Sequence, residues 1–503
     1  MSMPSKQERW IVYARWFLAS GGLLAVLASA GTAIAAYYVA PASDMEAGLN
    51  PIWNEAKYFV LDVQTGMVFT AAATLILWGM LRVLTWRLDA RAVPVRGRAI
   101  ATILGLLAVC VFARVIVKNH PVFVETLRVT AFPSSEAPDQ ITLTWADSPD
   151  TTQSIQWRTA PGSPAVTVRY RTQGATDWQT ADSTNESFMA ENMANDDKIE
   201  WHTARLADLQ PGTGYEYEVG SETAWSETRK FTTAPAASEA FSFMYLGDSQ
   251  IGLQDYGNLL DVGYEAHPEA AFVIHAGDLV NRGCDRDDWD LFFHASRNVF
   301  DQYPIMPTIG NHDDCGVEDP RLYIMYFDLP KNGSDVLSKE QTYAFTYGNA
   351  LFVTLNSNLK VEEQTPWLEE QLAHSDAEWK FLLWHHPAYA SRSVRDNPDV
   401  RKYWGALADK YGVDIVFQGH DHAYARSKPI HDGQVADGTI PGVIYVLAVS
   451  GTKFYDQDPN ELFEVGYEKM PTYQIIHVDG KTLRYEAYDI HNKLVDDFSL
   501  TKK

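Results

Sequence analysis

Five apolar runs after residue 240 each lead into a short motif rich in glycine, aspartate, asparagine and histidine. In chain order the motifs are Gly247-Asp248-Ser249-Gln250, Gly277-Asp278, Gly310-Asn311-His312-Asp313, His385-His386-Pro387 and Gly419-His420-Asp421-His422. The runs have the length of buried strands, and the spacing of Trp289, Phe292 and Phe293 between two of them predicts a helix. Alternating strands and helices predict a layered α/β domain, in which the carboxyl ends of the strands open into one crevice. We therefore expect the five motifs to meet in one place.

The motifs carry oxygen and nitrogen donors that suit metal ions. Carboxylate, amide and imidazole ligands together favour Mn, Fe or Zn, and the lack of cysteine among them argues against a structural zinc site. Two acids, one asparagine and three histidines exceed the need of one ion and predict two ions that share a carboxylate. The candidate ligands are Asp248, Asp278, Asn311, His385, His420 and His422. Apart from GHDH, which is the strongest single motif, each motif alone is more often an ordinary turn or helix end, and the prediction rests on the whole set in this order.

Residues 121–236, before the α/β part, are predicted to form a separate β-sandwich. Ile141, Leu143 and Trp145 alternate with polar residues, as a half-buried strand does. About a hundred residues of such short segments, separated by turn residues, are typical of a sandwich. In the stretch 206–220 a Pro-Gly turn precedes Tyr215 and Tyr217, and this arrangement resembles a fibronectin type III domain.

The motif order GD, GD, GNHD, HHP and GHDH resembles that of the calcineurin-like metallophosphoesterase superfamily. The sequence GHDHAYAR at 419–426 is similar to the GHxHxYER of the purple acid phosphatases, which also carry a sandwich before the catalytic domain. The resemblance covers residues 122–503 and implies, for residues 237–503, a four-layer domain of two sheets flanked by helices. It also implies an acid phosphatase-like enzyme that hydrolyses phosphoesters with two divalent or trivalent metal ions, Fe, Mn or Zn.

The resemblance also assigns roles to individual positions. Asp248 and His422 would bind the first ion, and Asp278 would bridge both ions. The side chains that would bind the second ion follow three different strands: Asn311, His385 and His420. His312 would stand beside the leaving group and protonate it.

The chain departs from the family pattern around the first ion. Asn281 stands where purple acid phosphatases have a tyrosine, and Gln250 stands where many other relatives have a histidine. Either carboxamide, or water, could fill the vacant position, and without a tyrosinate a divalent first ion such as Mn(II) or Fe(II) is plausible. The branch's later histidine has no counterpart; Arg392 and Arg395 lie in that stretch and are candidates to hold phosphate. Two roles stay open for His386: it could orient the neighbouring His385 or contact the substrate.

The first 120 residues are predicted to be a membrane anchor of three transmembrane helices, at about 16–38, 58–81 and 99–117. Apolar stretches of about 20 residues are long enough to cross the hydrocarbon layer. Basic residues precede the first stretch and lie between 82 and 98, which places the N-terminus in the cytoplasm and the catalytic part outside it. The alternatives are a buried helical hairpin of a soluble protein and, for the first stretch, a signal peptide.

The net charge and the cysteines indicate which partners and which cellular compartment to expect. The net charge of −24 argues against a nucleic-acid surface. Cys284 and Cys315, which each follow a metal motif, are hypothesised to form a disulfide outside the cytoplasm.

Two other functions stay open beside the phosphatase: a phosphodiesterase acting on lipid-linked or cell-wall-linked phosphoesters, and a non-catalytic, membrane-anchored binding protein.

Overall fold

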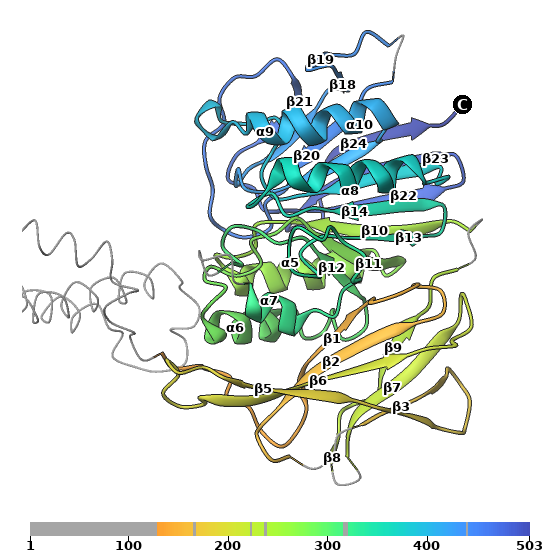
Figure 1. The fold of residues 1–503 in the computed structure, drawn as a ribbon, viewed down its shortest axis with the longest axis vertical. Helices are drawn as coiled ribbons and strands as arrows, with labels where there is room; N and C mark the ends of the chain where they lie inside the picture. The colour runs from red at the N-terminus through yellow and green to blue at the C-terminus, as the bar shows by residue number, and fades with distance from the viewer. Residues whose placement is uncertain (1–127, 164–166, 222–223, 236–238, 315–319, 439–440) are drawn as a thin grey trace, which may run out of the picture. The chain divides into compact units, whose positions relative to one another are not determined.

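The computed structural model describes residues 128–503, apart from 164–166, 222–223, 236–238, 315–319 and 439–440 (Figure 1). Arg128–Lys503 forms one compact unit. It consists of a β-sandwich followed by a larger α/β domain. The domain boundaries at 120 and 236 remain predictions.

The predicted fold class is corrected in its transmembrane part. The longest helix in the described part of the chain, α5 (Leu253–Ala266), has 14 residues, whereas about 20 are needed to span a bilayer. No helix in these described ranges is both long and apolar enough to cross a membrane. The three predicted spans, 16–38, 58–81 and 99–117, lie outside the described residues.

The sandwich consists of two antiparallel sheets. The first has the order β1-β2-β6-β5, with β1 (Asp139–Thr144), β2 (Gln153–Thr159), β5 (Thr184–Met189) and β6 (Lys198–Leu206). The second has the order β4-β3-β7-β8, with β9 also paired to β7; its strands are β3 (Thr167–Thr172), β4 (Gln179–Asp182), β7 (Gly214–Ser221), β8 (Ala224–Trp225) and β9 (Arg229–Thr232). Apolar side chains from both sheets, among them Trp157 and Tyr217, fill the space between them. The amide of Gln210 donates to the Tyr215 hydroxyl at 2.9 Å, which fixes the turn before β7.

The outer face of the first sandwich sheet packs against the α/β domain. Trp145 lies edge-on to Phe272 with the ring centroids 5.3 Å apart, and Trp201 lies edge-on to Tyr326 at 4.7 Å. Both tryptophans belong to the core of the α/β domain. Strand β2 is therefore buried along its whole length, because both of its faces are covered.

Two sheets form the middle of the α/β domain. The first has the order β12-β11-β10-β22-β23-β24, with β10 (Phe241–Leu246), β11 (Ala270–His275), β12 (Ile305–Pro307), β22 (Thr472–Asp479), β23 (Thr482–Asp489) and β24 (Leu494–Thr501). The second has the order β13-β14-β15-β16-β20-β17-β21, with β13 (Tyr343–Tyr347), β14 (Ala350–Thr354), β15 (Trp379–Leu383), β16 (Ile415–Gln418), β17 (Tyr424–Ser427), β20 (Ile444–Leu447) and β21 (Phe463–Tyr467). Strands β10, β11 and β12 are parallel, as are β14, β15, β16 and β20. Phenylalanines pack between the sheets. The ring centroid of Phe243, for example, lies 5.2 Å from that of Phe352 and 5.6 Å from that of Phe381.

Helices cover the two outer faces, which completes the four layers (Figure 1). On the first sheet lie α5, α6 (Arg286–Ser296) and α7 (Arg321–Tyr326), and α6 is the helix predicted from Trp289, Phe292 and Phe293. On the second sheet lie α8 (Val361–Ala373), α9 (Pro398–Val400) and α10 (Ala406–Tyr411). A short π-helical turn, η4 (Arg401–Gly405), joins the last two, η3 (Ser393–Arg395) precedes them, and β18 (Ile430–His431) pairs with β19 (Gln434–Val435) nearby.

Candidate metal centre

Four of the predicted ligands have a left-handed backbone directly after or close to the end of a strand. The φ angles are 52° at Asp248, 56° at Asp278, 73° at His420 and 48° at His422. Non-glycine residues rarely adopt this conformation, which costs on the order of 1–3 kcal/mol and is concentrated at functional sites. The backbone here is therefore held in place by its surroundings.

One donor group gathers around His385. The Nε2 atom of His385 lies 3.2 Å from Asp278 Oδ2 and 3.1 Å from Asn311 Oδ1. The Nδ1 atom of His420 lies 3.0 Å from the same Asn311 oxygen and 3.2 Å from His385 Nε2. These four donors come from four strand ends, and they converge on one point as ligands of a single ion would.

A second donor group shares Asp278 with the first. Ligand atoms of Asp248, Asp278 and His422 lie within 4.8 Å of one another. The Gln250 amide nitrogen lies between them, 3.0 Å from Asp278 Oδ2 and 3.2 Å from His422 Nε2. Gln250 thus occupies the predicted position, but in this arrangement its amide nitrogen faces the group, whereas a ligand would present the oxygen.

Asp248 is the clearest sign that a cation belongs in this group. Both of its carboxylate oxygens are buried and have no hydrogen-bond partner among the described residues. Burial, together with the Asp278 carboxylate, raises the pKa of Asp248 well above its ordinary value. A buried carboxylate is costly unless it is paired or coordinates a metal, so the residues present fit a metal ion at this position.

The imidazoles are oriented by backbone carbonyls. His385 Nδ1 contacts the Ala276 carbonyl at 2.8 Å, and His422 Nδ1 contacts the Lys453 carbonyl at 3.1 Å. In both residues this contact turns Nε2 toward the carboxylates, as is usual for ligating histidines. Burial and the nearby Lys453 lower the pKa of His422 to about 3, so this ring is neutral and able to coordinate a metal at physiological pH.

Asp313 holds the backbone around the proposed bridging residue Asp278 in place, a role that was not predicted from the sequence. Its Oδ2 accepts from the amides of Asp278 and Gly310, both at 2.8 Å, and its Oδ1 accepts from the Leu279 amide at 2.8 Å. The two backbone segments approach so closely that a Cβ on Gly310 would lie 2.1 Å from the Asp278 nitrogen. The GNHD motif already contained Asp313, but nothing in the sequence shows that the side chain turns back to bind backbone amides.

His312 lies directly beside the bridging carboxylate. Its amide donates to Asp278 Oδ1 at 2.8 Å, and its ring Nδ1 contacts the Asn281 carbonyl at 2.8 Å. Asn281, predicted as a possible ligand, thus serves through its backbone as a support for His312. The Nε2 atom of His312 is left for another partner.

The three predicted substrate residues lie at the rim of the site and differ in their contacts. The His386 ring centroid is 4.2 Å from that of His420, and its Nδ1 contacts Ser357 Oγ at 2.9 Å. Arg395 donates to Asp421 Oδ1 at 3.1 Å and to the His420 carbonyl at 2.6 Å. Its guanidinium is therefore engaged in holding the loop of His420.

Arg392 and Arg395 both lie over the ring of Tyr455, with their guanidinium carbons 5.1 and 5.0 Å from its centroid. What differs is that Arg395 also binds the loop of His420. The centroid of the Tyr455 ring is 4.8 Å from that of His422. Lys453 lies 5.7 Å from the same ring. Tyr455 and Lys453 are rim residues that the sequence analysis missed, because they follow β20 far from any of the five motifs.

Comparison with known proteins gives consistent matches to both parts of the described chain. Residues 138–233 match the family described as the purple acid phosphatase N-terminal domain, and residues 241–424 match calcineurin-like phosphoesterase. Purple acid phosphatase 15 of Arabidopsis thaliana is 28% identical over 50% of this chain and 53% of its own length. The Fe(3+)-Zn(2+) purple acid phosphatase 12 of the same plant is 25% identical over 59% of this chain and 66% of its own length. The chain thus spans less than two thirds of the length of these curated relatives.

A solved structure agrees at the level of the fold. Purple acid phosphatase PPD1 from yellow lupin seeds superposes with a TM-score of 0.64 and 19% identity, over 73% of this chain and 74% of the lupin chain. At this identity the match bears on the fold alone.

Proposed function

Because residues 241–424 match calcineurin-like phosphoesterase and residues 138–233 match the purple acid phosphatase N-terminal domain, we propose that the chain is a metal-dependent phosphatase. The observation that carries the proposal is the pair of donor groups that share Asp278. A donor set in which one carboxylate belongs to two groups is suited to two ions that lie about 3.5–4 Å apart. Phosphoesters are the substrates that such a centre would hydrolyse.

The candidate ligands form two sets, one for each metal ion. Asp248 and His422, with Gln250 or water, would hold one ion, and Asp278 would bridge. The other ion would lie among the side chains around His385, namely Asn311, His385 and His420. Imidazole, amide and carboxylate ligands are compatible with Fe, Mn or Zn, and a relative carries Fe(3+) and Zn(2+) in its name. When bound, such a pair of ions lowers the pKa of water and offsets the charge of the phosphoryl oxygens.

His312 is suited to the leaving-group side of the reaction. Its amide and Nδ1 are fixed by Asp278 and by the Asn281 carbonyl, so the ring sits beside the bridging carboxylate with Nε2 available. From this position His312 would give a proton to the departing oxygen, a step that contributes typically about 10²–10⁴-fold.

A location outside the reducing cytoplasm fits the cysteines. Cys284 is disulfide-bonded, and disulfides persist in oxidising compartments. The predicted partner, Cys315, lies outside the described residues. Alkylation and mass spectrometry of protein isolated from its own cells should find Cys284 protected until a reductant is added, and a freely alkylated Cys284 would contradict this location.

The test of the proposed function uses the full chain, stripped of metal and then reloaded with Fe(II), Mn(II) or Zn(II). Hydrolysis of p-nitrophenyl phosphate and of bis(p-nitrophenyl) phosphate should appear on reloading and disappear in Asp278→Asn. His312→Ala should keep the bound metal and lose turnover about 10²–10⁴-fold, whereas the exposed control His374→Ala should match the unaltered chain. Metal binding without hydrolysis of any ester would favour the non-catalytic binding protein, and full turnover in His312→Ala would refute the role of His312.

A further inference from the structure

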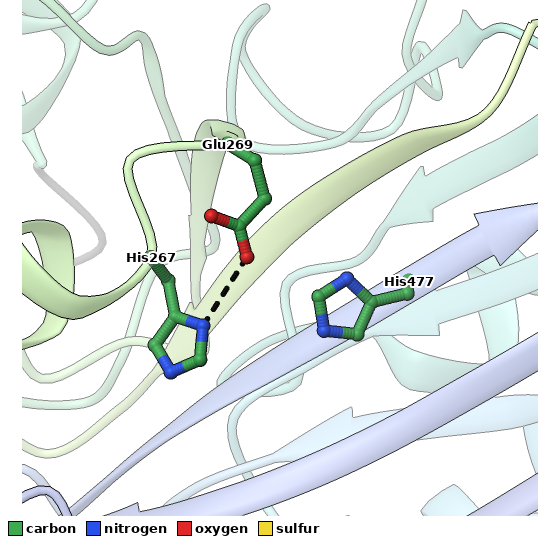
Figure 2. A group of neighbouring side chains, drawn as sticks. All are labelled: His267, Glu269 and His477. Carbon is green, nitrogen blue, oxygen red and sulfur yellow. Dashed lines mark hydrogen bonds and ion pairs between the residues drawn. The ribbon is translucent and has the colours of Figure 1, made fainter.

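A second group of metal-ligating side chains lies outside the candidate metal centre (Figure 2). It consists of His267, which follows α5, Glu269, which precedes β11, and His477 in β22. Ligand atoms of the three residues lie within 4.8 Å of one another. Figure 2 shows the His477 ring facing the pair formed by His267 and Glu269, whose Nδ1 and Oε1 atoms are 3.2 Å apart.

This group is at the opposite end of the sheet from the candidate metal centre. Ser242, the second residue of β10, contacts His477 Nδ1 at 2.8 Å, whereas Asp248 follows the other end of the same strand. Likewise Glu269 precedes β11, and Asp278 follows it. The length of the strands therefore separates the two groups, and neither belongs to the other.

Neighbouring side chains hold the two imidazoles in place. The His267 ring centroid lies 4.8 Å from that of Tyr488 and 6.0 Å from that of Tyr473. Glu486 Oε2 lies 3.0 Å from His477 Nε2, and the Glu486 side chain is only 7% exposed. Since the Ser242 hydroxyl contacts the other ring nitrogen, an ion bound to His477 would take the place of one of these two contacts. A buried carboxylate beside a ligating histidine fixes the ring and raises its basicity. The other oxygen of Glu486, Oε1, lies 2.5 Å from Arg484 Nη2, so this ion pair holds the carboxylate beside His477.

We propose that His267, Glu269 and His477 bind a Zn(II) ion, supported by Glu486, with water in the fourth position. Two imidazoles and a carboxylate are typical zinc ligands, and imidazole donors argue against Mg(II) or Ca(II), which prefer all-oxygen sites. Because Glu486 is paired with Arg484, Glu269 is the carboxylate of the cluster that would offset the charge of the ion. The ion would link the turn between α5 and β11 to β22, which lie far apart in the sequence.

The direct test is a crystal of the full chain grown with zinc, with anomalous data collected on both sides of the zinc edge. We expect a zinc peak among His267, Glu269 and His477. Because the map resolves positions, zinc at the candidate metal centre does not interfere. The absence of a peak at the His267 cluster, when zinc saturates the candidate metal centre, would overturn the proposal.

Solution measurements test the same site without a crystal. By equilibrium dialysis, the double variant His267→Ala/His477→Ala should bind one zinc ion fewer per chain than the unaltered protein. Glu269→Gln, which alters an exposed side chain and leaves the packing intact, should weaken this site at least tenfold. The exposed control His491→Ala should bind zinc as the unaltered chain does.

The outcome is independent of the phosphatase activity. Hydrolysis of phosphoesters by the reloaded enzyme should be the same in Glu269→Gln as in the unaltered chain, since the cluster lies at the far strand ends. Equal zinc content and equal zinc affinity in all the variants would show a hydrogen-bonded polar cluster only and would contradict the proposal.

Discussion

Asp278 combines constraints that rarely occur together at one residue. It has a left-handed backbone, its side chain is 1% exposed, and it contacts His385, Gln250 and the His312 amide. Burial would raise the pKa of Asp278, but the charges of His385 and His312 outweigh it and lower that pKa. The residue is thus held ionised at the point where the two donor groups meet, as a bridging ligand must be.

Arg392 and Arg395 should differ when each is changed to alanine. Arg392 faces Tyr455 at the rim, so Arg392→Ala should raise the KM for a phosphomonoester about tenfold and leave kcat within about twofold, as expected for one lost charged contact of about 1–1.5 kcal/mol. Arg395 holds Asp421 and the His420 carbonyl, so Arg395→Ala should lower kcat as well. Steady-state kinetics of both variants with the same metal measures the difference. Equal effects on KM and kcat in the two variants would contradict the separate roles.

The sequence predicts the donor side chains that directly follow a strand, but it does not predict contacts between residues that lie far apart in the chain. The donors could be predicted because each motif directly follows its own strand. The supporting contacts could not, because Asp313 binds amides about 35 positions earlier and Ser357 meets His386 from another loop. Gln250 shows a further limit, since the sequence does not reveal which end of its amide faces the site.

The strands of the α/β domain were predictable where they are apolar throughout. The first sheet brings β10 next to β22, more than 200 residues later, and this pairing follows from no local pattern. The short edge elements β18 and β19 carry too few apolar residues to be predicted as strands. The resemblance to the purple acid phosphatases could nevertheless be predicted from the motifs and the sandwich, because both depend on local sequence, and family models match both parts.

Glu340, between α7 and β13, should make stability depend on pH. Burial and the neighbouring Asp328 raise the pKa of Glu340 to about 7, in spite of Lys331. Because the folded state binds this proton more tightly than the unfolded chain does, the stability it contributes is present below about pH 4.5 and is lost as the pH rises through 7. Relative to the unaltered chain, Glu340→Gln should therefore gain about 1–3 kcal/mol in the free energy of unfolding between pH 5 and pH 8.

Denaturant unfolding at the two pH values measures this gain. The exposed control Glu464→Gln should run parallel to the unaltered protein. A difference between Glu340→Gln and the unaltered chain that does not change with pH would contradict the assignment.

At the scale of the whole molecule, a buried ion pair joins the sandwich to the α/β domain. Arg158 of β2 and Asp290 of α6 are both 0% exposed, and their charged atoms are 2.7 Å apart. Gln140 Nε2 also donates to Asp290 at 2.9 Å. Together with Trp145 and Trp201, which pack against Phe272 and Tyr326 of the α/β domain, this pair makes the sandwich a fixed part of the described unit.

Removing one partner of that pair should be costly. Arg158→Met leaves the buried Asp290 carboxylate with Arg286, 3.5 Å away, and Gln140 as its remaining partners, and should lower the free energy of unfolding by about 1–3 kcal/mol. Lys410→Met, which breaks the exposed pair with Glu369, should change it by at most about 1 kcal/mol. Denaturant unfolding of both variants tests this contrast, and a loss under 1 kcal/mol in Arg158→Met would show that the pair does not join the two domains.

The donors around Asp278 are expected to hold two metal ions. Anomalous diffraction from crystals of the metal-loaded chain, recorded at the edges of Fe, Mn and Zn, tests this expectation most directly. We expect two peaks about 3.5–4 Å apart, one on each side of the Asp278 carboxylate. A single peak, or peaks that leave Asp248 and His422 without a metal ion, would contradict it.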